Sequence, residues 1–141
     1  MSAWTKGELD RIAAADELEI ASLRRDGTLR GPVTIWVVRH GDDLYVRSVK
    51  GPSGVWFRGT RARHEGRIQA GGVDRDVTFV KADDKLSDEI DRAYRTKYRR
   101  YAANIVNSVL TPGARSATLR LVPRESARST SRTPSSSRRP S

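Results

Sequence analysis

Residues 31–54 read GPVTIWVVRHGDDLYVRSVKGPSG, and this stretch decides the fold. Every residue from 33 to 38 is β-branched or aromatic, a composition that predicts a buried strand. The polar residues 40–43 are typical of a hairpin connection, so residues 44–49 are expected to form the return strand. Turn-forming residues between 50 and 54 then end that strand.

Strand-like alternation of apolar and polar residues extends outward from this hairpin, over Glu17 to Ala82. Residues 67–70 and 76–80 predict a second hairpin across a glycine-rich turn, and residues 117–122 predict a last strand. So many antiparallel pairs disfavour a doubly wound sheet, and a small barrel is the natural way to remove their edges. We therefore expect a mainly β fold of about six antiparallel strands.

Helices are predicted at two places. Thr5 and Glu8 fit a capping box for a short helix over residues 6–15, with Trp4 as a candidate staple. A second helix, placed before the last strand, begins at Ser87 as N-cap. Its apolar and aromatic face comprises Ile90, Ala93, Tyr94, Lys97, Tyr98 and Tyr101. Residues 55–63 fit one helical turn or a loop.

The chain has 141 residues, enough for one domain, which we assign to residues 1–123. Residues 124–141 form an Arg/Ser/Pro-rich tail with too few apolar residues to fold, and we expect disorder there. This tail carries five Arg and one Glu, so the body keeps a charge of +6 out of +10. A basic body attracts phosphates, but it has no Lys/Arg block with interleaved aromatics, so nucleic acid is an expected partner only through the tail.

Several functional classes are disfavoured by what the sequence lacks. Cysteine is absent, neither histidine has a ligand-type neighbour, and we expect no metal site. No apolar run approaches the ~18 residues of a membrane span, so a cytoplasmic protein without membrane contact is expected. Walker, dinucleotide-glycine and nucleophile-elbow motifs are also missing.

The loop after the first hairpin is the candidate site. Arg47, Ser48, Lys50 and Gly51, together with backbone N–H groups freed where the strand ends, can converge on a phosphate. An ordinary Gly/Pro turn with two solvated cations fits the same residues. Trp56 and Arg58 follow and fit either the flank of a planar ligand or, for Trp56, a plug at the barrel end.

Residues 31–72 resemble the FMN-binding split-barrel superfamily, which includes pyridoxamine-phosphate-oxidase-like proteins and deazaflavin-dependent nitroreductases. Glu17 to Pro123 resembles, within it, the bacterial family called domain of unknown function 2255. The shared pattern comprises Trp36, Ser48, Lys50, Gly51, Pro52 and Trp56. Residues 59–66 depart from it, because they stand where such families commonly have an Asn-Pro-like turn.

This resemblance implies a split β-barrel that binds FMN or a deazaflavin, although some split barrels bind no flavin. It implies that Ser48, Val49, Lys50 and Gly51 hold the cofactor phosphate. It also implies that Thr34, Trp36, Trp56 and Arg58 face the ring or ribityl chain, and that the protein is a homodimer.

The preferred hypothesis is a flavin- or deazaflavin-dependent oxidoreductase acting on a small organic substrate, with Tyr94 or Tyr98 donating a proton. One alternative is a cofactor-free split barrel that binds a small ligand or catalyses a non-redox step in secondary metabolism. Another is a basic accessory protein whose tail contacts nucleic acid.

Overall fold

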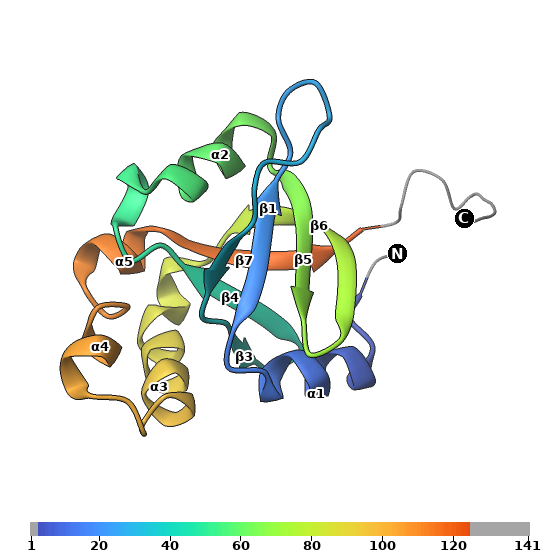
Figure 1. Ribbon diagram of the computed structural model, residues 1–141. Coiled ribbons are helices and arrows are strands. Elements are labelled where there is room, and N and C mark those ends of the chain that lie inside the picture. The colour runs from blue at the N-terminus through green and yellow to red at the C-terminus, as the bar shows by residue number, and fades with distance from the viewer. Residues whose placement is uncertain (1–2, 125–141) are drawn as a thin grey trace.

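One antiparallel sheet of seven strands, in the order β2-β1-β5-β6-β7-β4-β3, forms the centre of the protein (Figure 1). The computed structural model describes residues 3–124, so the tail predicted to be disordered lies outside the described residues except for Arg124. The strands are β1 Leu18–Ser22, β2 Val33–Ile35, β3 Val38–His40, β4 Asp43–Arg47, β5 Glu65–Ala70, β6 Val73–Lys81 and β7 Thr118–Pro123. Seven strands replace the expected six because residues 33–38 make two.

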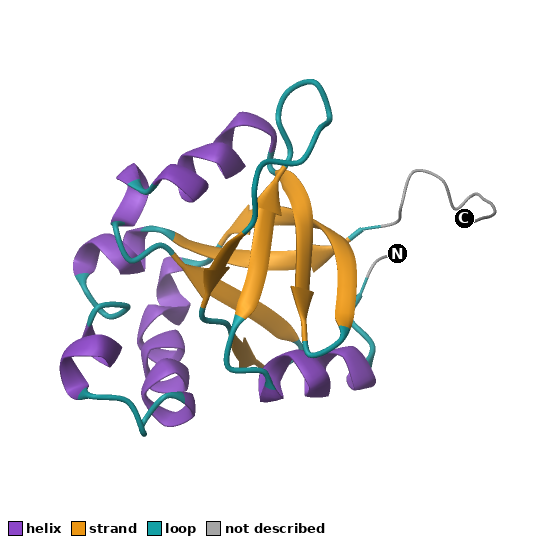
Figure 2. Cartoon of the chain, viewed as in Figure 1, coloured by secondary structure: helices purple, strands orange, loops and turns teal. Residues whose placement is uncertain are grey.

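The prediction of one buried strand over residues 33–38 was wrong. β2 pairs with β1 at one end of the sheet, β3 pairs with β4 at the other end, and only Trp36 and Val37 lie between them. Three residue steps span at most about 11 Å, so the two edges of the sheet must come close together. The sheet is therefore curled into an incomplete barrel, as Figure 2 shows.

Both predicted hairpins are present. Each has a two-residue turn: β3 and β4 pair across Gly41-Asp42, and β5 and β6 pair across Gly71-Gly72. Gly71 and Gly72 have φ angles of 56° and 82°, the left-handed conformation that a two-residue hairpin turn requires. β7 joins the two halves of the sheet, because it lies between β6 and β4.

Helix α1, Lys6–Ala14, has the predicted capping box: the Thr5 hydroxyl accepts from Glu8 N–H, and the Glu8 carboxylate accepts from Thr5 N–H. Trp4 and Leu9 then pack into the same core. Helix α3, Ser87–Lys97, begins one residue before the predicted position, since Leu86 is its N-cap and Ser87 its first helical residue. Residues 55–63, predicted as one helical turn or a loop, form a helix of nine residues, α2 (Val55–Arg63). Two short helices were not predicted: α4 (Ala103–Asn107) and α5 (Pro112–Ser116).

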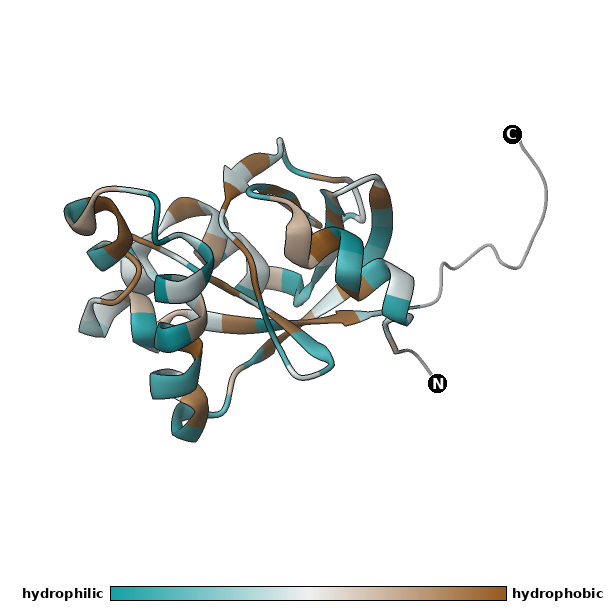
Figure 3. Ribbon diagram, turned by 90° about the horizontal axis from the view of Figure 1, so that it is seen from below, coloured by the Kyte–Doolittle hydropathy of each residue, from teal (hydrophilic) through white to brown (hydrophobic). Residues whose placement is uncertain are grey.

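The buried apolar side chains form two hydrophobic clusters. One core fills the inside of the curled sheet, and the second lies where α3 packs on β3 and β4. Apolar and polar segments alternate along the ribbon in Figure 3, as expected for elements that bury one side. Short 3₁₀ turns, Gly51–Ser53 and Asp84–Leu86, precede α2 and α3. No described helix is long and apolar enough to cross a membrane.

Arg47, the last residue of β4, ties the sheet to the helices. Its side chain is fully buried and paired with the Asp91 carboxylate of α3. The same guanidinium donates to the Thr118 hydroxyl (2.9 Å), the Val109 carbonyl (2.9 Å) and the Ser87 carbonyl (3.2 Å). A buried cation needs this many partners because desolvation is otherwise too costly.

We expect Asp91→Ala to lower the free energy of unfolding by about 3–5 kcal/mol, because the substitution leaves Arg47 buried without its counter-charge. Urea denaturation measures the loss. The control is Asp88→Ala on the same helix, whose carboxylate is 80% exposed and pairs with Arg115, so that a much smaller loss is expected. Similar losses in the two variants would contradict a structural role for the buried pair.

Candidate functional site

A cavity of about 850 Å³ opens beside the curled sheet, between α2, the β1–β2 edge, the end of β4 and the α4 region. This volume is in the range of small-molecule sites. Apolar side chains such as Val33, Ile35 and Trp36 make up much of its wall, and its charged residues are Arg24, Arg30, Arg47 and Lys50. None of the lining residues is acidic. The cavity therefore suits an anionic ligand with an apolar body.

The loop after β4 turns sharply at the cavity wall. Gly51 has a φ of 70°, and its N–H donates to the Ser48 carbonyl (2.9 Å). A Cβ on Gly51 would lie 3.3 Å from the backbone of Gly113, so glycine also permits close packing against α5. The loop thereby keeps Ser48 buried and leaves Lys50 exposed, and both line the cavity.

The N-terminus of α2 lies at this loop. Gly54 is the N-cap and makes no side-chain capping bond, so the first N–H groups of α2, which have no intrahelical acceptor, are not capped by it. A Cβ on Gly54 would lie only 2.4 Å from the Ser48 hydroxyl oxygen, which shows how closely that hydroxyl sits over the helix start. Because a helix N-terminus carries partial positive charge, this arrangement favours an anion.

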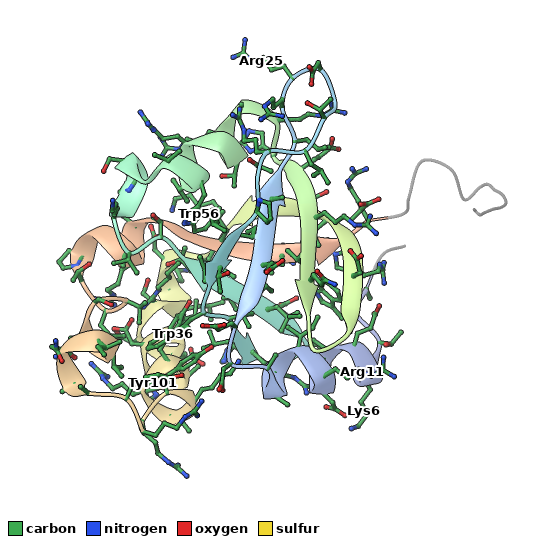
Figure 4. All side chains as sticks on the ribbon, viewed as in Figure 1. Lys6, Arg11, Arg25, Trp36, Trp56 and Tyr101 are labelled. Atoms are coloured by element: carbon green, nitrogen blue, oxygen red, sulfur yellow. The ribbon has the colours of Figure 1, made fainter. Side chains whose placement is uncertain are left out.

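Most residues proposed from the sequence to bind a cofactor meet at this cavity. Seven of them line it: Thr34, Trp36, Arg47, Ser48, Val49, Lys50 and Trp56. Arg47 contributes to the wall, but its guanidinium is engaged by Asp91. Gly51 does not line the cavity; its positive φ allows the turn that follows Ser48. Arg58 is exposed on α2 and lies outside the cavity. In Figure 4, Trp56 lies below α2 and Trp36 nearer to Tyr101.

Tyr94 and Tyr98 are the phenols considered as proton donors. Tyr94 belongs to α3 and Tyr98 is its C-cap; both are buried in the core that α3 forms with the sheet, and neither lines the cavity. The Tyr98 hydroxyl accepts from Val37 N–H (3.2 Å) and donates to the Asp16 carbonyl (2.6 Å). The Tyr98 ring stacks on Trp36 at 3.8 Å. Burial raises the pKa of both phenols, which makes them weaker acids.

Lys97 also bonds to the backbone of Val37, in the short link between β2 and β3. Its ammonium group donates to the Val37 carbonyl (2.7 Å), and burial lowers the pKa of Lys97 to about 8.

Sequence reasoning missed part of the cavity wall. Ser22, Arg24 and Arg30 come from the end of β1 and the loop that follows, and Ile105, Ser108 and Val109 come from the α4 region. No motif marks these positions. The uncapped N–H groups at the start of α2 were also missed, because the sequence of residues 55–63 fits either one helical turn or a loop.

The family DUF2255, described as "Uncharacterized protein conserved in bacteria", matches residues 8–121. The chain belongs to this family. Comparison of its sequence with curated proteins finds no match. The resemblance to DUF2255 inferred from Trp36, Ser48, Lys50 and Gly51 is thus confirmed.

Solved structures resemble this DUF2255 member in fold. An F420 reductase has a TM-score of 0.54 at 14% identity, over 88% of this chain and 97% of that one. A FAD-binding protein from Mesorhizobium loti has a TM-score of 0.53 at 17% identity, over 87% and 92% of the two chains. A protein of unknown function from Agrobacterium tumefaciens has a TM-score of 0.57 at 9% identity, over 86% and 55%. These likenesses show the split-barrel fold alone.

The two buried tyrosines of this DUF2255 chain should respond differently to loss of the hydroxyl. Tyr94 Oη is buried and has no hydrogen-bond partner among the described residues, so Tyr94→Phe should leave the free energy of unfolding unchanged or raise it. Tyr98→Phe should lower it by about 1–3 kcal/mol, because Val37 N–H loses its acceptor. Chemical denaturation of the two variants measures both changes in the free energy of unfolding. Equal changes would refute the claim that only the Tyr98 hydroxyl is hydrogen-bonded.

Gly54→Ala should lower the free energy of unfolding by about 1–3 kcal/mol through overpacking against Ser48. The φ and ψ of Gly54, −59° and 140°, suit alanine, so the cost is steric rather than conformational. Gly7→Ala is the matched control, because nothing lies within 4 Å of its added Cβ; inside α1 it should raise stability by about 0.5–1 kcal/mol. Thermal or urea unfolding of both variants measures these changes. An unchanged free energy of unfolding in Gly54→Ala would contradict the close approach of Gly54 to the Ser48 hydroxyl.

Proposed function

We propose that the cavity binds a flavin-type cofactor, FMN or a deazaflavin, and that the protein is an oxidoreductase acting on a small organic substrate. The observation that carries the proposal is the convergence of the Ser48 hydroxyl, the Lys50 side chain and the start of α2 on a cavity wall without acidic residues. Charge-assisted donors of this kind suit a phosphate.

The apolar wall supports the same proposal. Thr34, Trp36 and Trp56 also line the cavity and suit the ring or ribityl chain of the cofactor. Trp36 is a rigid surface for a planar ring, because its indole stacks on Tyr98 at an interplanar angle of 3°. Such a cofactor supplies the hydride chemistry when bound, and the protein supplies binding and orientation.

Each of the other predicted residues has a place in this proposal. Val49 and Gly51 shape the phosphate loop, and Arg47 supports that loop from within the core through Asp91. Arg58 lies outside the cavity and has no assigned contact. Proton donation by Tyr94 or Tyr98 is not included, because neither phenol lines the cavity.

We also propose that a second copy of the chain covers the cavity mouth. Val33, Val49, Val55 and Ile105 all line the cavity and are 37%, 54%, 76% and 46% exposed. Apolar side chains gathered at one opening favour a contact that removes them from water. This supports the homodimer that the family resemblance implies.

The cofactor proposal is tested by titrating FMN and a deazaflavin into the protein and into Lys50→Ala, with fluorescence and thermal shift as readouts. Loss of the charged donor should weaken binding about 10- to 100-fold. Lys85→Ala, which removes an exposed lysine of the turn before α3, should leave affinity unchanged.

Two results would overturn this proposal. Absence of binding and of any thermal shift at high micromolar cofactor would favour a cofactor-free barrel that uses the same cavity for a small ligand. Equal affinities of wild type and Lys50→Ala would refute the placement of the phosphate.

A further inference from the structure

A second group of polar side chains lines the cavity away from the Ser48–Gly54 loop. Ser22 ends β1, and Arg24 and Arg30 belong to the loop that connects β1 to β2 (Figure 1). Ser22 is 5% exposed and Arg30 is half-buried, whereas Arg24 is exposed. The cavity thus has cationic residues on two separate segments.

This loop is held in a defined conformation. Arg30 N–H donates to the Ser22 carbonyl (2.9 Å), and Arg24 N–H donates to the Thr28 carbonyl (2.7 Å). The Arg24 guanidinium donates to the Thr28 hydroxyl (3.2 Å) and the Leu29 carbonyl (3.0 Å). From α2, Arg63 points its guanidinium toward the carbonyls of the same turn, at 3.5 Å from Arg24. The basic side chains are therefore presented by a folded turn.

The two loop arginines that line the cavity form no direct ion pair with a described residue. Arg30 Nε is buried without a hydrogen-bond partner among these residues. The nearby acid, Asp26, accepts instead from the N–H and hydroxyl of Thr28 (3.0 and 2.7 Å). The Arg30 side chain as a whole is only half-buried, so an oxyanion in the cavity would supply the counter-charge that no described residue supplies.

Helix α2 makes room for these groups through Gly59. A Cβ on Gly59 would lie 2.6 Å from the Ser22 hydroxyl oxygen and 3.0 Å from Arg30 Nε. Gly54, the N-cap of the same helix, is the corresponding point of approach for Ser48. Helix α2 therefore packs closely against both polar groups of the cavity wall.

We propose that Ser22, Arg24 and Arg30 form a second oxyanion subsite, which binds a carboxylate or phosphate of the substrate, so that the substrate is a small organic anion. The proposal rests on the proposed function for the cofactor in the other half of the cavity. The same chemistry would also bind a second anionic group of the cofactor itself, and the experiment separates these two sources.

The test uses benzoate and its neutral counterpart benzamide as probes, titrated by NMR into the full chain with and without saturating FMN or deazaflavin. Benzoate should bind and benzamide should bind at least tenfold more weakly. Arg30→Met, which keeps an unbranched stem and removes the charged end of the side chain, should weaken benzoate about tenfold and leave cofactor affinity within twofold.

The matched control is Arg25→Met in the same loop. Arg25 does not line the cavity, and its side chain extends from the tip of the loop (Figure 4), so neither benzoate nor cofactor affinity should change. Ser22→Ala is the second variant and should weaken benzoate about threefold while keeping the fold, because the Ser22 hydroxyl makes no hydrogen bond to a described residue.

Three results would overturn the subsite as a substrate site: no benzoate binding at millimolar concentration, equal affinities for benzoate and benzamide, or an Arg30→Met variant that weakens the cofactor and spares benzoate. The last result would assign the loop to the cofactor. Benzoate binding that depends on Arg30, in a protein that binds neither FMN nor deazaflavin, would support the subsite and refute the proposed function.

Discussion

The two-residue link between β2 and β3 is the constraint on which the rest of the structure depends. Trp36 and Val37 connect the opposite edges of a seven-stranded sheet, and so short a link forces the sheet to curl until those edges are neighbours. The link cannot take part in either strand ladder. Its backbone groups must find partners elsewhere, since a buried unpaired N–H or C=O is costly.

Helix α3 supplies those partners. Tyr98 accepts from Val37 N–H, and Lys97 donates to the Val37 carbonyl, so the end of one helix closes the gap between the two edge strands. The same contact stacks Tyr98 on Trp36 and fixes the indole at the cavity wall. Two aromatic residues that the sequence marked as site candidates thus differ in role: Trp36 lines the cavity, whereas Tyr98 is hydrogen-bonded to the link through Val37.

Local features were predictable because short-range chemistry decides them. The capping box at Thr5 and Glu8, the turns at Gly41 and Gly71, and the end of β4 before Gly51 each depend on residues a few positions apart. Helix α2 was not predictable in the same way, because it depends on the burial of Phe57 in the core and on close approaches of Gly54 and Gly59 to other elements. Propensity is a weak guide when packing determines the outcome.

By itself, the sequence determined an antiparallel barrel-like domain with a hydroxyl, a cation and a glycine where the return strand of the first hairpin ends, since periodicity and turn residues are local properties. Only the tertiary structure decided that Arg47 turns inward to Asp91 while Lys50 remains at the cavity. It also brought Arg24 and Arg30 to the cavity that Ser48 lines. The physical reason is that the destination of a charged side chain depends on which distant groups can compensate its desolvation, and those groups are neighbours only after the sheet has curled.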